Sequence, residues 1–176
     1  QLCSNTSFGT DTDGRVVFNL TNRQTAILNG QSPTNFTVSY YKDASLTDLI
    51  SNPISYVNSN LQETIYVKVA NNQNPTCFAT TSFQTEVFSL PNINSTASLK
   101  QCDDNNDGFS AFNLTQANAL LVGATSGLTF SYFETSTDAQ SNINPIPNFT
   151  AYTNQTVSTD QVFIRVQNAN GCFRVA

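Results

Sequence analysis

The sequence contains no histidine, no methionine and no tryptophan, and only seven of its 176 residues are lysine or arginine. Histidine is the usual general base at neutral pH and the commonest transition-metal ligand, so its absence removes most catalytic triads and most zinc sites. We therefore expect that the protein is not an enzyme. The few basic residues and the net charge of −5 argue against a nucleic-acid partner, because neutralising phosphates requires clustered lysine and arginine.

Long apolar runs are also absent. No stretch approaches the roughly 20 residues of a membrane-spanning helix, and no signal peptide is present, so we expect no membrane insertion and a mature or excised segment. Threonine, serine, asparagine, valine, isoleucine and aromatic residues are abundant instead. This composition favours strands joined by side-chain-bonded turns, and it predicts an all-β fold.

The chain contains an internal repeat. DTDGRVVFNLT (Asp11–Thr21) matches NNDGFSAFNLT (Asn105–Thr115), with the FNLT tetrapeptide identical. Chance is a poor explanation, because further matches occur in the same order. They are Cys3 with Cys102, Ser39-Tyr40-Tyr41 with Ser131-Tyr132-Phe133, Tyr56-Val57-Asn58 with Tyr152-Thr153-Asn154, Ile65–Val69 with Val162–Val166, and Cys77-Phe78 with Cys172-Phe173.

Local patterns predict the elements of each repeat. Alternating apolar residues predict strands. Thr21-x-x-Gln24 resembles a capping box that opens a helical turn near Thr21–Asn29, and a similar turn is expected near Thr115–Val122. The Asn170-Gly171 pair predicts a tight hairpin.

The strand patterns and the repeat together predict two tandem immunoglobulin-like β-sandwiches of about seven strands each. We place them at residues 1–90 and 91–176, with a short linker around Leu90–Asn94. The second repeat stops at Ala176, before any counterpart of Thr80–Leu90. We therefore expect its last strand to be cut and the parent protein to hold a longer array.

Four cysteines complete the framework: Cys3, Cys77, Cys102 and Cys172. Their wide spacing and the lack of histidine make a zinc site improbable, and an even count suits disulfides in an oxidising compartment. Each repeat has one equivalent pair, so we predict the bonds Cys3–Cys77 and Cys102–Cys172.

The second repeat resembles a known family. The run CDDNNDGFSAFNLT (Cys102–Thr115), followed by SYFET (Ser131–Thr135), AYTN (Ala151–Asn154) and VFIRVQNANGCF (Val162–Phe173), is similar to repeats of roughly 100 residues in very large secreted proteins of Bacteroidetes, especially flavobacteria. The resemblance implies export by the type IX secretion system, attachment to the outer membrane at the cell surface, and a role in adhesion or gliding motility, as in SprB-like adhesins.

The loop after Cys102 is a candidate calcium site. Asp103, Asn105 and Asp107 alternate as in the first half of an EF-hand loop, and the Phe109 carbonyl is a fourth candidate ligand. The twelfth position is Leu114 rather than an acidic residue. A further carboxylate would have to come from elsewhere, with the candidates Asp104, Glu134, Asp138 and Asp160. In the first repeat only Asp11 and Asp13 remain as weaker candidates. The alternative is a loop that caps its own backbone.

The expected function is that of structural or adhesive stalk repeats, with neighbouring repeats and the secretion machinery as partners. One alternative is a glycan-binding module, which would need exposed aromatic side chains in a shallow cleft and would contact extracellular glycans or surfaces. Another is a spacer in a secreted polysaccharide-degrading enzyme.

Overall fold

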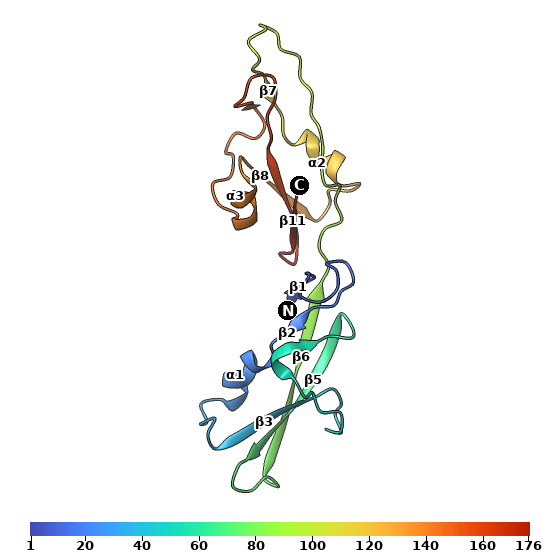
Figure 1. Ribbon diagram of the computed structural model, residues 1–176, viewed down its shortest axis with the longest axis vertical. Coiled ribbons are helices and arrows are strands. Elements are labelled where there is room, and N and C mark those ends of the chain that lie inside the picture. Colours follow the sequence, from blue (N-terminus) through green and yellow to red (C-terminus); the bar gives the residue numbers. More distant parts are fainter. The chain divides into compact units, whose positions relative to one another are not determined.

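The computed structural model describes all residues from Gln1 to Ala176. They divide into two compact units, Gln1–Ser89 and Leu90–Ala176 (Figure 1). Each unit has its own apolar core. Both units consist mainly of strands and turns with a few short helices.

The first unit contains six strands arranged in two sheets. The larger sheet has the order β1-β6-β5-β3, and the smaller one pairs β2 with β4. The strands are β1 (Leu2–Cys3), β2 (Val17–Phe18), β3 (Phe36–Tyr41), β4 (Tyr56–Val57), β5 (Gln62–Asn71) and β6 (Phe78–Phe88). The helical turns are η1 (Leu20–Arg23), α1 (Gln24–Leu28) and η2 (Pro53–Ser55).

Alternation along β5 and β6 builds the core of this unit. Ile65 and Val67 on β5 are completely buried, and Val87 on β6 joins the same cluster. The two strands are antiparallel, with Ile65 opposite Phe83 and Val67 opposite Thr81. Because successive side chains of a strand point to opposite faces, this register places the apolar residues of both strands on one side.

The second unit contains five strands and two helices. Its three-stranded sheet has the order β11-β10-β8, and β7 pairs with β9. The strands are β7 (Ala111–Phe112), β8 (Leu128–Phe133), β9 (Tyr152–Thr153), β10 (Phe163–Asn168) and β11 (Phe173–Val175); the helices are α2 (Gln116–Leu121) and α3 (Ser136–Ser141).

The two units repeat the same register. In the first, Val67 lies opposite Thr81. In the second, Ile164 and Ala176 exchange both backbone hydrogen bonds, at 2.9 and 3.0 Å. The sequence match pairs Val67 with Ile164 and Thr81 with Ala176, so the paired strands keep the same register, although the turn between them is two residues longer in the first unit.

The helical turns form where they were predicted, but a different residue caps them. The predicted cap was Thr21. The side chain of Asn19 caps the turn instead, because it accepts the backbone N–H of Thr21 at 3.1 Å. Asn113 does the same for Thr115 in the second unit, also at 3.1 Å. Each Asn also accepts from the Thr hydroxyl, at 2.6 and 2.7 Å. The repeated Asn-Leu-Thr triplet is therefore a capping element.

The units have six and five strands where about seven were expected, and α3 was not predicted. The start of α3 is capped by Thr135, whose hydroxyl oxygen accepts the Asp138 N–H at 3.1 Å. None of the helices has the length and apolar character needed to cross a lipid bilayer.

Candidate functional site: the cysteines and the loops beside them

Cys3 and Cys172 are the disulfide-bonded pair, and Cys77 and Cys102 are free thiols. Neither predicted bond, Cys3–Cys77 or Cys102–Cys172, is formed. The bonded cysteines are the first and the last of the four in the sequence.

Strand β6 explains why Cys3 and Cys77 do not pair. Cys3 lies opposite Phe88 at the end of this strand, whereas Cys77 directly precedes Phe78, where the strand begins. Eleven residues of strand at about 3.3 Å each span about 36 Å. A disulfide needs Cα atoms within about 7 Å, so the fold of the first unit itself prevents this bond.

Equivalent cysteines differ in exposure. Cys172 is completely buried, whereas its counterpart Cys77 is exposed. Cys3 is partly buried, whereas its counterpart Cys102 is exposed. In both comparisons the bonded cysteine is the more buried one.

A buried asparagine holds the loop near each N-terminal cysteine. In the first unit, Asn58 accepts the Val16 N–H at 2.7 Å and donates to the carbonyls of Gly14 and Asn60 at 2.8 and 2.9 Å. Gly14 has a φ of 72°, the left-handed region that favours glycine. The asparagine thus satisfies three backbone groups of the loop.

Asn154 repeats this arrangement in the second unit. It accepts the Ser110 N–H at 2.7 Å and donates to the carbonyls of Gly108 and Thr156 at 2.8 and 2.7 Å. Sequence reasoning matched the two asparagines as part of the repeat but gave them no role. The available signal was that both repeats have asparagine at this position, although their sequences have diverged.

We expect Asn58→Ala to lower the free energy of unfolding of the first unit by about 2 kcal/mol, because it leaves the buried Val16 N–H and two partly buried carbonyls without this partner. Urea unfolding followed by circular dichroism would measure the loss. Asn60→Ala, at an exposed side chain nearby, is the matched control and should change little. Equal effects of the two variants would contradict this role.

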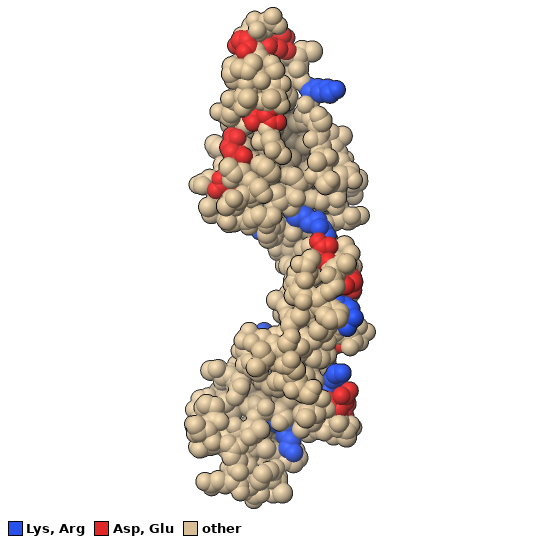
Figure 2. Space-filling view, in the orientation of Figure 1, with Lys and Arg blue, Asp and Glu red and all other residues tan.

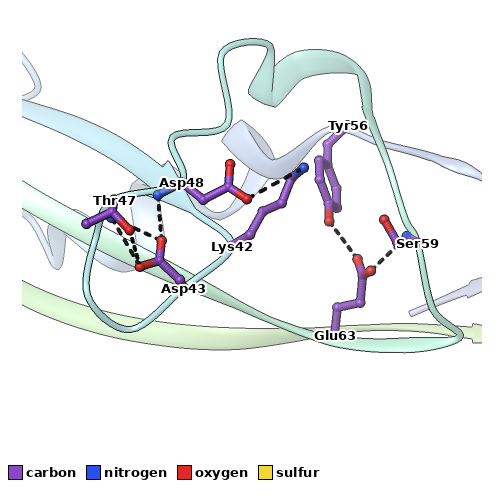
Figure 3. A network of polar contacts seen from close by, with 7 residues as sticks. All are labelled: Lys42, Asp43, Thr47, Asp48, Tyr56, Ser59 and Glu63. Atoms are coloured by element: carbon purple, nitrogen blue, oxygen red, sulfur yellow. Dashed lines mark hydrogen bonds and ion pairs between the residues drawn. The ribbon is translucent and has the colours of Figure 1, made fainter.

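A tyrosine and a carboxylate close the next turn in each unit. The Tyr56 hydroxyl donates to Glu63 at 2.7 Å, and Glu63 also accepts the Ser59 N–H at 2.7 Å (Figure 3). The same carboxylate accepts the Asn60 N–H at 2.9 Å. Burial and the Glu63 carboxylate raise the pKa of Tyr56 above its ordinary value. Nearby, Asp43 closes the turn after β3 by accepting from Thr47 and Asp48 (Figure 3).

Asp160 takes the position of Glu63 in the second unit. The Tyr152 hydroxyl lies 2.7 Å from Asp160 and 2.9 Å from Glu134, and Asp160 accepts the Gln155 N–H at 2.7 Å. Burial alone would raise the pKa of Asp160, but these hydrogen bonds bring it below its ordinary value. Two of the candidate distal calcium ligands, Glu134 and Asp160, therefore act in a turn.

The predicted calcium loop bonds to its own backbone. Asp103 accepts the N–H groups of Asn106 and Gly108 at 2.8 and 2.6 Å, and these donors, Gly108 first, hold the pKa of Asp103 below its usual range. Asp107 accepts the Phe109 N–H at 2.9 Å and the Asn105 amide at 2.7 Å. No group of three acidic residues is arranged to hold a metal ion. Calcium binding here stays a prediction from the sequence.

The weaker candidates in the first unit behave in a similar way. Asp13 accepts the N–H groups of Thr10 and Arg15, both at 2.9 Å, which lowers its pKa. The Arg15 guanidinium stacks 4.3 Å from the centre of the Phe8 ring. The structure does not bring Asp11 and Asp13 into a group of metal ligands.

The second unit has a groove beside its apolar core. Its volume is about 580 Å³, and its walls include Phe112, Leu114, Tyr152 and Ile164 together with Ser158–Val162. The corresponding core of the first unit is closed by Thr85 and Val87 of β6, each about 4% exposed. In the second unit, Ser95–Leu99 also line this groove, and Ile93 and Leu99 pack against the core.

Charged side chains are few and scattered over the surface. In Figure 2 the lysine and arginine side chains lie apart from one another, without a basic patch on the face shown. Arg165 and Lys68, at equivalent positions, stack on Phe173 and Phe78, at 3.2 and 4.4 Å from the ring centres. These cations therefore stabilise the hairpins of their own units.

Comparison with known proteins agrees with the internal repeat. The family model described as the Flavobacterium inter-domain disulphide bond domain matches residues 1–91 and again residues 98–176. No curated protein matches the chain. The two matches together cover nearly all of the sequence, and each contains one cysteine of the bonded pair. The chain therefore belongs to the Flavobacterium inter-domain disulphide bond domain family and contains this domain twice.

Proposed function

We propose that the chain is a structural segment of a secreted array on the flavobacterial cell surface, in which a disulfide fastens each module to the next one. Each module is an immunoglobulin-like sandwich, and the array serves adhesion or gliding, as in large adhesins exported by the type IX system. The segment carries load and carries out no catalysis.

The observation that supports this proposal is which of the four cysteines form the disulfide bond. The bonded pair takes Cys3 from the first repeat and Cys172 from the second, although each repeat has two cysteines of its own. A module that used its disulfide to stabilise itself would pair within the repeat. A bond from one repeat to the other links modules instead, and the description of the family agrees with this reading.

The chemistry of the remaining side chains supports a passive role. The chain has no histidine, and the acidic side chains of the loops are engaged in capping backbone N–H groups. A stable disulfide also fits an oxidising location outside the cytoplasm. These features suit a spacer that must remain folded and extended outside the cell.

Cutting the backbone between the repeats tests the proposal. Residues 95–98 are exposed, so a specific protease site can be introduced there. After cleavage of the oxidised protein, we expect the two halves to migrate together on a non-reducing gel and to separate only after reduction. The variant Cys172→Ser is the control, and its halves should separate without a reductant.

Halves that separate without a reductant in the unsubstituted protein would overturn the proposal, since they would show bonds within the repeats. Size-exclusion chromatography before cleavage adds a second criterion. In the variant with Cys77→Ser and Cys102→Ser, a disulfide-linked dimer would show that Cys3 bonds to Cys172 of another molecule, and the bond would then join chains rather than neighbouring modules.

A further inference from the structure

We propose that Cys77 and Cys102 are the two halves of further bonds of the same kind, Cys77 to the preceding module of the array and Cys102 to the following one. This inference rests on the proposed function, because it extends the Cys3–Cys172 bond to modules on either side. It assigns a partner to each free thiol. The disulfide bonds would then form a continuous series along the array.

The repeat alignment supplies the first argument. Cys102 occupies in the second repeat the position that Cys3 occupies in the first, and Cys77 occupies the position of Cys172. The bond therefore joins the N-terminal cysteine of one repeat to the C-terminal cysteine of the next. Applied to Cys102, this rule requires the C-terminal cysteine of a following repeat. Applied to Cys77, it requires the N-terminal cysteine of a preceding repeat.

The surface around Cys77 supplies an independent argument. Cys77 lies in an open groove of about 440 Å³ whose walls include Ile27, Phe36, Val69 and Phe78. The Phe78 side chain is 51% exposed, whereas its counterpart Phe173 is half-buried and follows a completely buried cysteine. A partly apolar groove that borders an exposed thiol fits the N-terminal segment of another module, because that segment carries the complementary cysteine.

Cys102 is equally available. It is exposed, and its neighbour Asp103 is held by hydrogen bonds within the same loop. Two thiols lose two protons and two electrons to form one disulfide, and one molecule of oxidised glutathione, reduced to two thiols, takes them up.

A tandem fusion of two copies tests the rule. Residues 82–99, placed between Ala176 of the first copy and Gln1 of the second, restore the spacing that separates Cys77 from Cys102 in the natural chain. The test variant carries Cys77→Ser in the first copy and Cys102→Ser in the second. It keeps the Cys102 and the Cys77 that the rule joins, one on each side of the junction.

The matched control carries the opposite substitutions, Cys102→Ser in the first copy and Cys77→Ser in the second. Its remaining free cysteines lie in the outer repeats of the fusion, where the rule gives them no partner. Both proteins are refolded with oxidised glutathione, and the thiols of the monomeric fraction are counted by alkylation and mass spectrometry. We expect no free thiol in the test variant and two in the control.

Peptide mapping without reduction identifies the bonds, and it distinguishes a failure of this inference from a failure of the proposed function. Cys3–Cys172 bonds together with a Cys102–Cys77 bond across the junction support the inference. Cys3–Cys172 bonds with two free thiols in the test variant overturn the inference and leave the proposed function in place. Bonds between Cys3 and Cys77, or between Cys102 and Cys172, overturn both.

Discussion

Pulled by its two ends, the oxidised chain should lengthen very little. The Cys3–Cys172 bond encloses residues 4–171, so a force applied at residues 1 and 176 passes through the disulfide and bypasses both folded units. Reduction opens this covalent loop. The 168 enclosed residues then contribute up to about 590 Å of contour length, at about 3.5 Å per residue.

Single-molecule force spectroscopy with handles at the two termini measures this difference. The variant with Cys77→Ser and Cys102→Ser keeps the bond and excludes thiol exchange, so it should remain short. Cys3→Ser should release the full length without a reductant. An oxidised protein that lengthens by about 80 Å would contradict the expectation, since bonds within each repeat leave only residues 78–101 free to extend.

Extending the second repeat with a strand from the first should stabilise it strongly. Residues 82–90 of the first repeat, attached after Ala176, would continue β11 in the register that β6 keeps with β5. Phe83 and Val87 of the grafted copy would then enter the groove beside Phe112 and Tyr152. Burying these two side chains is worth about 4 kcal/mol, which corresponds to roughly a thousandfold slower exchange of the most protected amides.

Hydrogen exchange measured by mass spectrometry on peptides from β8 (Leu128–Phe133) reads out this effect in the second unit alone. The matched control is the same extension with Phe83→Ser and Val87→Asp in the grafted copy, which keeps the length but cannot fill an apolar groove. Equal protection in the two extended proteins would show that the groove does not accept a strand.

The sequence predicted the repeat and its strands because both depend on local patterns. Alternating residues such as Ile65 and Val67 give a strand whose register follows from the buried face. The helical turn after FNLT was also placed correctly. The prediction of the capping residue was wrong. Asn19 and Thr21 are both good capping residues, and only the backbone geometry decides which of them caps the turn.

The disulfide pairing could not be derived in the same way. Two equivalent cysteines per repeat are consistent with bonds inside each repeat and with bonds from one repeat to the next, because both arrangements use the same residues. The decision depends on the length of β6, which holds Cys3 and Cys77 at opposite ends. The role of Asn58 was missed for a similar reason, since two of its three partners, Val16 and Gly14, lie in a backbone segment that is distant in sequence.

Strand β6 also bears on how the native bond is reached during biosynthesis. Cys77 is closer to Cys3 in the sequence than Cys172 is, and its shorter loop would close on Cys3 roughly three times more often in an unfolded chain. Oxidation ahead of folding therefore favours the wrong partner, and thiol–disulfide exchange must then correct the error. Once β6 has formed between Phe78 and Phe88, Cys77 is out of reach. Folding of the first repeat ahead of oxidation thus leaves Cys3 available for Cys172.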